Sequence, residues 1–139
     1  MENLIYNDGK VIIFPITKDE LRILSQSFVD FMVAINLNYG CQKYDKPEKI
    51  IEKIEFLEKN PENPERNTFW MILKIDERKI VGHLCLTENK DGKIGFETYL
   101  ADGYDEKIMK RAILLLADYE KECNVKIDYE TNDFSKGMV

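Results

Sequence analysis

Apolar residues near the start of the chain form a strand pattern that passes directly into a helix pattern. The run from Val11 to Ile16 is β-branched and aromatic, which is typical of a strand. Thr17 and Glu20 follow with the spacing of a capping box, which predicts the start of a helix. Apolar residues at steps of three and four then predict a single helix that reaches about Asn36; they are Leu21, Leu24, Phe28, Phe31, Met32 and Ile35.

A second amphipathic segment begins at Lys46 and Pro47, since proline suits the first position of a helix. Its apolar face comprises Ile50, Ile51, Ile54 and Leu57, and Phe56 lies off that face. The segment from residue 60 to 64, which contains Asn60, Pro61, Asn63 and Pro64, is predicted to form a surface loop.

Three strand patterns come next, separated by two short turns. The predicted strands are Thr68 to Ile75, Lys79 to Thr87 and Lys93 to Leu100. The second turn contains the pair Asp91-Gly92, which readily adopts the positive φ of a hairpin. We therefore expect an antiparallel meander.

The last two predicted elements are a helix and a strand. The helix runs from about Asp105 to Cys123 and has a broad apolar face, with Asn124 as its stop. Val125 to Thr131 is a strand that must join the same sheet. The predicted order is strand, two helices, three strands, helix, strand.

Composition narrows the class of protein. A chain of 139 residues, 44% of them hydrophobic, has the size of one domain with one core. Its apolar runs are too short for a membrane span, and no leader pattern follows Met1, so we expect a soluble cytoplasmic protein. The three cysteines form no CxxC pair, which is consistent with a reducing compartment. The net charge of −6 and the absence of a basic cluster argue against nucleic-acid binding.

Four local motifs occur in the order found in one enzyme superfamily. Trp70 opens the first meander strand, Val81-Gly82 lies in the second, and Gly95-Phe96-Glu97-Thr98-Tyr99-Leu100 forms the third. Asn132-x-x-Ser135 follows the last strand. Together they resemble the GNAT N-acetyltransferase superfamily over residues 11 to 135. The resemblance implies an α/β (α+β) fold in a single domain, residues 1–139, with a mixed, mostly antiparallel sheet flanked by helices, and acetyl-coenzyme A as cofactor.

The chain departs from that superfamily at two places. Active members read Arg/Gln-x-x-Gly-x-Gly/Ala before the long helix, where bare backbone amides hold the cofactor's pyrophosphate. The matching residues here are Asp105, Glu106, Lys107, Ile108, Met109 and Lys110. Acidic residues suit the first turn of a helix but repel a phosphate. The chain also ends before the superfamily's last two strands, so we expect an open sheet edge and pairing into a homodimer.

The resemblance also designates candidate site residues. Glu97 is the candidate base that would deprotonate an amine acceptor, and a solvent-facing strand residue is the alternative reading. Tyr99, Tyr104 and Tyr129 could each donate a proton, with a packing role as the alternative reading, and Tyr129 is taken as the catalytic candidate. The cofactor-binding candidates are Tyr99, Leu100, Lys107, Ile108, Met109, Lys110 and Asn132.

The remaining residues with reactive or metal-binding side chains give weaker indications of a functional site. His83 and Cys85 lie two apart in one strand, where packing is the more common role for both. The acidic segments interleave with lysines, and no metal-binding motif is present, so no metal is expected.

Three functions remain open at this point. The first is an acyl-coenzyme A-dependent N-acyltransferase of unknown substrate. The second is a non-catalytic GNAT-like module that binds a protein or a small molecule, which the altered loop favours. The third, an acidic immunity or inhibitor protein, has only charge and size behind it.

Overall fold

The computed structural model describes residues 4–35, 38–39 and 47–129, which form a mixed α+β fold. The strands are β1 (Tyr6–Asn7), β2 (Val11–Pro15), β3 (Asn38–Tyr39), β4 (Phe69–Lys74), β5 (Lys79–Glu88), β6 (Lys93–Leu100) and β7 (Lys126–Ile127). The helices are α1 (Lys18–Gln26), α2 (Phe28–Ile35), α3 (Pro47–Lys59) and α4 (Lys107–Glu122), with a 3-10 turn, η1, at Pro64–Asn67. The predicted order of the main elements is confirmed, except that the first predicted helix is divided into α1 and α2; β1 and β3 are additions to it.

The strands form one curled sheet in the order β1-β2-β4-β5-β6-β7, and β3 pairs with β5 outside this path. The pairs β2–β4, β4–β5 and β5–β6 are antiparallel, so the predicted meander is confirmed. β7 runs parallel to β6 and pairs with it at Lys93 and Ile94. The described part of the predicted strand Val125 to Thr131 is therefore shorter than expected; residues 130 and 131 lie outside the described residues.

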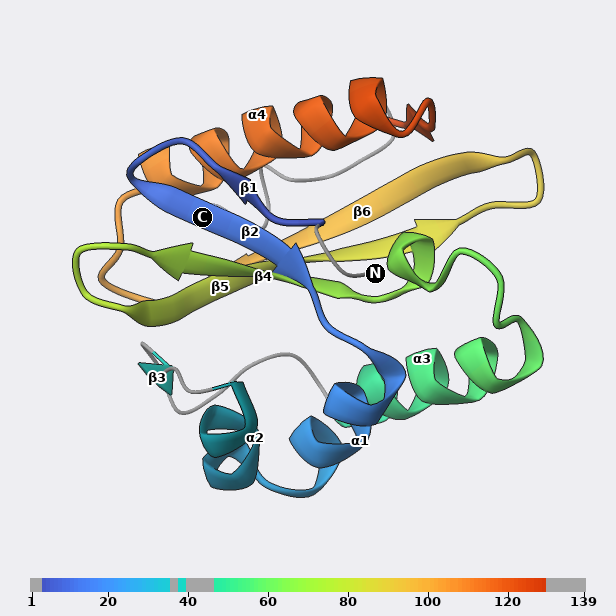
Figure 1. Cartoon of the computed structure of the whole chain (residues 1–139), viewed down its shortest axis with the longest axis horizontal. Helices are drawn as coiled ribbons and strands as arrows, with labels where there is room; N and C mark the ends of the chain where they lie inside the picture. The colour runs from blue at the N-terminus through green and yellow to red at the C-terminus, as the bar shows by residue number, and fades with distance from the viewer. Residues whose placement is uncertain (1–3, 36–37, 40–46, 130–139) are drawn as a thin grey trace.

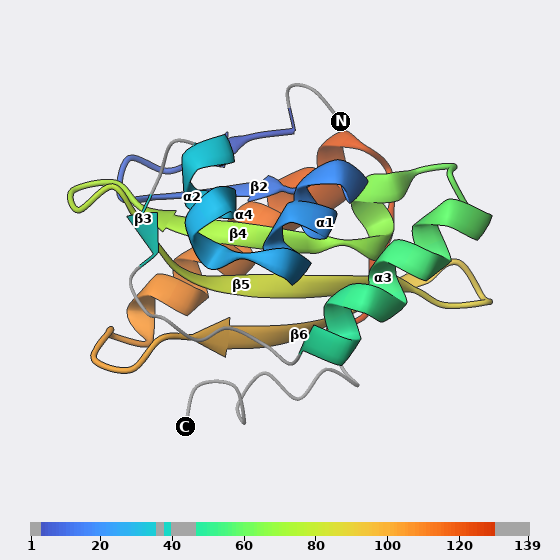
Figure 2. The ribbon, with the colours of Figure 1, turned by 90° about the horizontal axis from the view of Figure 1, so that it is seen from below.

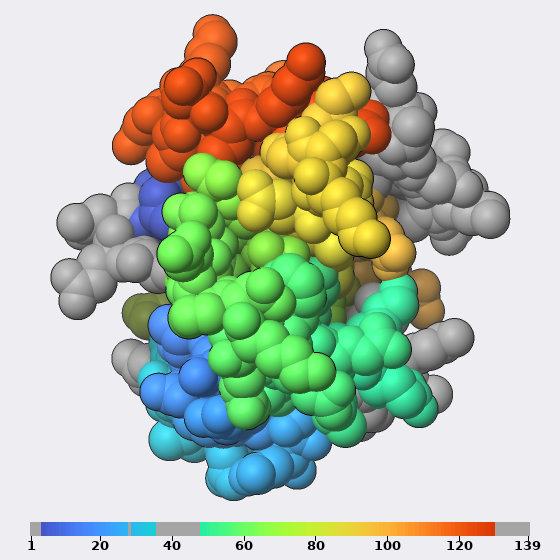
Figure 3. All heavy atoms as spheres, turned by 90° about the vertical axis from the view of Figure 1, so that its right-hand side faces the viewer, coloured from blue at the N-terminus to red at the C-terminus, as the bar shows by residue number. Residues whose placement is uncertain are grey.

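Helices cover both faces of the sheet (Figures 1 and 2). α4 packs on one face, and α1, α2 and α3 lie on the other, so that the molecule has three layers (Figure 3). Strand alternation divides the apolar side chains between two cores. The core under α4 is centred on Trp70, Leu84, Phe96, Met109 and Tyr119. The core under α1–α3 is centred on Leu21, Phe31, Ile54, Phe69 and Met71.

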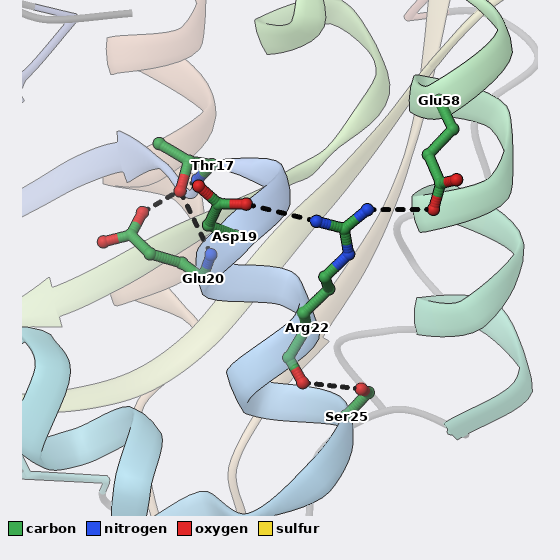
Figure 4. Close-up of polar contacts among 6 residues, drawn as sticks. All are labelled: Thr17, Asp19, Glu20, Arg22, Ser25 and Glu58. Carbon is green, nitrogen blue, oxygen red and sulfur yellow. Dashed lines mark hydrogen bonds and ion pairs between the residues drawn. The ribbon is translucent and has the colours of Figure 1, made fainter.

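The first helical region is two helices, which corrects the prediction of one continuous helix to Asn36. α1 begins as predicted: the Thr17 hydroxyl accepts from the Glu20 N–H at 3.1 Å, and the Thr17 N–H donates to the Glu20 carboxylate at 2.8 Å (Figure 4). Ser27 then adopts an extended conformation, and its hydroxyl accepts from the Asp30 N–H at 3.2 Å. A serine side chain that binds a nearby amide offers the backbone an alternative to the helix, so the chain breaks there.

Gly82 of β5 lies close to the backbone of the neighbouring strand β6. The register between β4 and β5 shifts here, since Ile72 pairs with Gly82 and Leu73 pairs with Ile80. A Cβ on Gly82 would lie 2.2 Å from the carbonyl oxygen of Tyr99 in β6. Only glycine fits this position without a shift of the backbone.

Candidate active site

The chemistry-bearing residues of β5 and β6 gather on the sheet face that α3 covers. Cys85 pairs with Glu97, and His83 pairs with Tyr99, in the antiparallel register. Residues directly opposite each other share a face, as do residues two apart on one strand. The sheet therefore brings together four side chains that the sequence presents as separate candidates.

α3 lies over this patch and leaves a hollow of about 240 Å³ beside it. Figure 2 shows α3 crossing β5 and β6 on this face. The lining residues come from α3, β5, β6 and the segment before β4; they are Lys49, Glu52, Lys53, Phe56, Asn67, Cys85, Thr87 and Glu97. Four of these eight side chains carry a charge, which makes the hollow suited to a polar, charged ligand.

Glu97 reaches out from β6 to the lysine at the start of α3. The Lys49 Nζ donates to the Glu97 Oε2 at 2.5 Å, and the Glu97 side chain is 67% exposed. The carboxylate is thus accessible to a ligand and already holds an ammonium group. The structure places Glu97 where the solvent-facing reading expected it, and at the rim of a hollow.

Lys53 lies deeper in the same hollow. Its ammonium donates to the Leu86 carbonyl oxygen at 2.6 Å and to the Thr87 hydroxyl. Burial lowers the pKa of Lys53, and nearby acidic groups, including Glu97, oppose this effect. Sequence reasoning missed both lysines of this site; their spacing of four residues on one helix was the available signal.

His83 lies between two aromatic rings in the middle of β5. The Phe69 ring centroid is 4.8 Å from that of His83, and the Tyr99 ring is 5.2 Å away and stacked. His83 is only 3% exposed. Its surroundings are those of a packed core residue, although Glu97 lies on the same face one residue pair along.

The start of α4, where the resemblance places the pyrophosphate, is closed by an aspartate. The Lys107 N–H donates to the Asp105 Oδ1 at 2.9 Å, and the Ile108 N–H donates to the Asp105 carbonyl oxygen at 3.0 Å. Ile108 and Met109 lie on the buried face of α4, whereas the side chains of Lys107 and Lys110 are exposed. Two first-turn amides are therefore already bonded, and a carboxylate occupies the place of an anion.

The remaining candidates lie apart from Glu97. Tyr129 packs its ring against Phe96 on the α4 face, with centroids 5.8 Å apart, and its hydroxyl donates to Glu120 at 3.3 Å. Burial, followed by the Glu120 carboxylate, raises the pKa of Tyr129, so the hydroxyl keeps its proton. Leu100 packs against the core under α4. Asn132 lies outside the described residues.

Among the described residues, no three or more His, Cys, Asp or Glu side chains are grouped as metal ligands would be. No helix in the described ranges has both the length and the apolar character needed to cross a membrane.

Comparison with solved structures identifies the fold. The chain is similar to a protein assigned as an acetyltransferase from Sphaerobacter thermophilus, with a TM-score of 0.52 and 11% identity over 91% of this chain and 69% of that one. It is also similar to the Salmonella typhimurium acetyl transferase that modifies the N-terminal serine of ribosomal protein L7/L12, with a TM-score of 0.52 and 12% identity over 88% and 70% of the two chains.

A third similar structure is the ribosomal-protein-S5-alanine acetyltransferase from Vibrio fischeri, with a TM-score of 0.50 and 14% identity over 88% and 69%. No protein-family model and no curated protein sequence matches the chain. At these identities the likeness establishes the fold, which is that of the GNAT N-acetyltransferases, as the sequence motifs predicted.

Proposed function

We propose that this chain is a GNAT-type N-acyltransferase that transfers an acyl group to a primary amine bound in the hollow between α3 and β6. The observation that carries the proposal is the contact between the Glu97 carboxylate and an ammonium group, that of Lys49, at the rim of this hollow. The shared fold with acetyltransferases of ribosomal proteins supports it.

Amine acylation requires a base, since an amine arrives as an ammonium ion and must lose a proton before it attacks a carbonyl carbon. Glu97 meets the geometric requirement because its carboxylate is exposed and within reach of a ligand in the hollow. An exposed ion pair is worth only about 0–1 kcal/mol, so an acceptor ammonium exchanges with Lys49 at little cost. Glu52 adds a second carboxylate to the lining, so that Glu52 and Glu97 balance the charges of Lys49 and Lys53.

Lys53 positions the β5 wall of this hollow. Its two bonds to Leu86 and Thr87 fix α3 against the end of β5. We therefore treat Lys53 as a positioning residue and Glu97 as the base.

The donor side fits the proposal less well. The bonded amides at Lys107 and Ile108, with the Asp105 carboxylate against the helix end, do not fit the pyrophosphate of acyl-coenzyme A as an amide cradle would. Lys107 and Lys110, in the first turn of α4, have exposed ammonium groups. We expect weak binding of acyl-coenzyme A.

The poor fit of the start of α4 to a pyrophosphate favours a second candidate function, a GNAT-fold module that binds a cationic amine without acyl transfer. This module would use the same hollow beside Glu97 and would need no acyl-coenzyme A. The two candidates differ in whether acyl-coenzyme A binds and is consumed.

The test measures acetyl transfer from acetyl-coenzyme A to a panel of amines through the release of the free coenzyme A thiol. The panel comprises a polyamine, a lysine-containing peptide and a peptide with a free N-terminus. Glu97→Gln should lower kcat/KM by about 10²–10⁴-fold at neutral pH, the usual contribution of a general base. The defect should shrink as the pH approaches the pKa of the acceptor amine, because less of the acceptor then needs deprotonation.

Lys49→Gln is the matched control, since it removes the partner of Glu97 and leaves the carboxylate free; it should retain activity. Equal activity of Glu97→Gln and the parent chain would contradict the role of Glu97. Absence of transfer to every amine, with the amine still bound, would favour the binding module.

A further inference from the structure

A second hollow lies on the opposite side of the sheet from Glu97, at the start of α4. It has a volume of about 280 Å³ and is lined by residues 9–11 at the start of β2, residues 74–76 at the end of β4, and Lys107, Ile108 and Arg111 of α4. Figure 1 shows the β1–β2 turn, the β4–β5 turn and the start of α4 at the same end of the molecule. It shares no lining residue with the hollow beside Glu97.

Fixed contacts hold the three walls together. The Ile75 N–H donates to the Lys10 carbonyl oxygen at 3.1 Å, which joins the two turns. The Arg111 guanidinium donates to the Asp8 Oδ2 at 3.0 Å, which joins α4 to the β1–β2 turn. Burial acts to raise the pKa of Asp8, but hydrogen bonds from the Val11 and Lys10 N–H groups and from Arg111 lower it overall, so the carboxylate stays charged.

The lining is cationic although the whole chain is acidic. Lys10, Lys74, Lys107 and Arg111 line the hollow, and Asp76 is the one acidic residue among the lining positions. Lys74 is bound to Asp76 at 2.6 Å and to Glu77 at 2.9 Å. Within the described part of the chain, no carboxylate forms an ion pair with Lys10 or Lys107. Two ammonium groups from different elements therefore remain for a ligand.

The inner wall is apolar. Val11 and Ile108 are both buried in the core under α4, and Ile75 is half-buried. Contact between such a wall and a hydrocarbon group on the ligand stabilises the complex, and inorganic phosphate has no such group. The first-turn amide of Lys107 is already bonded to Asp105, so the side-chain cations, not the helix end, would hold the anion.

From this combination of convergent cations and an apolar wall, we propose that the hollow binds a small organic anion, a carboxylate or a phosphate monoester that carries a short apolar group. Lys10 and Lys107 contact the charged group, Arg111 is held in place by Asp8, and Val11 and Ile108 contact the apolar part. The hollow is separate from the proposed acceptor site beside Glu97, and it shares Lys107 and Ile108 with the cofactor-binding candidates. None of the probes used below contains coenzyme A, so the test does not depend on acyl transfer.

The test is a titration of the full ¹⁵N-labelled chain with phenyl phosphate, 4-methylpentanoate and inorganic phosphate. The amide chemical shifts of the chain are the readout. Saturable shifts should concentrate at residues 9–11, 74–76 and 107–108, with at least one organic anion binding in the range of about 0.1–1 mM, roughly 4–5.5 kcal/mol. Inorganic phosphate should bind at least about 10-fold more weakly. Comparison of the first two probes identifies the preferred anion.

The double variant Lys10→Gln/Lys107→Gln should weaken the organic anion at least about 10-fold, or 1.4 kcal/mol. Lys90→Gln/Lys126→Gln, which removes the same charge at exposed positions outside the hollow, should change it less than about two-fold. Equal weakening in both double variants, or shifts that do not saturate, would overturn the proposal. The dispersed amide spectrum of each variant serves as the check of folding.

Discussion

At the scale of single residues, Gly82 shows how a sequence motif and a packing requirement coincide. The pair Val81-Gly82 was one of the features that resembled the GNAT pattern, and the structure supplies its physical reason. The backbone of β6 approaches so closely that the Tyr99 carbonyl oxygen occupies the space of a Cβ. Sequence alone indicated the motif but not the neighbour, because Tyr99 is contributed by a strand seventeen residues away.

Gly82→Ala should destabilise the chain by about 1–3 kcal/mol, the usual cost of overpacking a site that cannot open freely. Gly95→Ala is the matched control, because a Cβ there meets no atom closer than 3.9 Å, and it should change stability by less than about 0.5 kcal/mol. Chemical denaturation of both variants measures the difference. Equal stability of the two would contradict the close approach of β6.

The candidate site was predictable from sequence only in part, because some of its contacts join residues that are far apart in the chain. Strand alternation placed Glu97 on the face opposite Phe96, and the structure agrees. The partner of Glu97 is Lys49, forty-eight residues earlier, and no local pattern identifies such a contact. The hollow and Lys53 were missed for the same reason.

At the scale of elements, local chemistry determines where helices begin and end. The capping box at Thr17 was read correctly because both of its bonds are between residues three apart. The break at Ser27 was missed because the apolar stripe continues across it: Leu24 and Phe31 are both buried in one core. Hydrophobic periodicity reports which face is buried and does not require the backbone to be continuous.

Thr17→Ala should lower the free energy of unfolding by about 1 kcal/mol, since it removes the acceptor of the Glu20 N–H. Ser25→Ala serves as the control within the same helix, because its exposed hydroxyl only donates to the Arg22 carbonyl (Figure 4). It should change stability by less than about 0.5 kcal/mol. Thermal or denaturant unfolding distinguishes the two variants, and a Thr17→Ala chain as stable as the parent would show that the cap contributes nothing.

The start of α4 is the element on which the donor side of the proposed function depends. Asp105→Asn keeps a hydrogen-bonding side chain at the helix end and removes the negative charge. It should tighten binding of acetyl-coenzyme A up to about 10-fold, or 1.4 kcal/mol, because the repelled pyrophosphate then meets a neutral cap. Calorimetric titration gives the affinity.

Asp102→Asn is the control for that prediction, since it removes the same charge from an exposed loop residue that lies just before the turn. It should leave the affinity nearly unchanged. Equal gains in both variants would show that overall charge, not the Asp105 cap, limits binding.

At the scale of the whole molecule, the layers follow from which strand faces are apolar. β5 is buried along nearly its whole length, as expected for a central strand covered by helices on both faces. The order of long elements was therefore predictable, whereas β1 and β3, of two residues each, were not, because so short a run carries no period. The pairing of β7 beside β6 was expected from topology, and its described length was not.

The measurement that tests the proposed function most directly is calorimetric titration of the whole chain with acetyl-coenzyme A and with desulfo-coenzyme A at low salt. An N-acyltransferase with the Asp105 carboxylate at the start of α4 should bind both, with a dissociation constant on the order of 100 μM, about 5.5 kcal/mol. No heat from either ligand at millimolar concentration, with the protein folded, would contradict acyl transfer and leave a GNAT-fold binding module as the function.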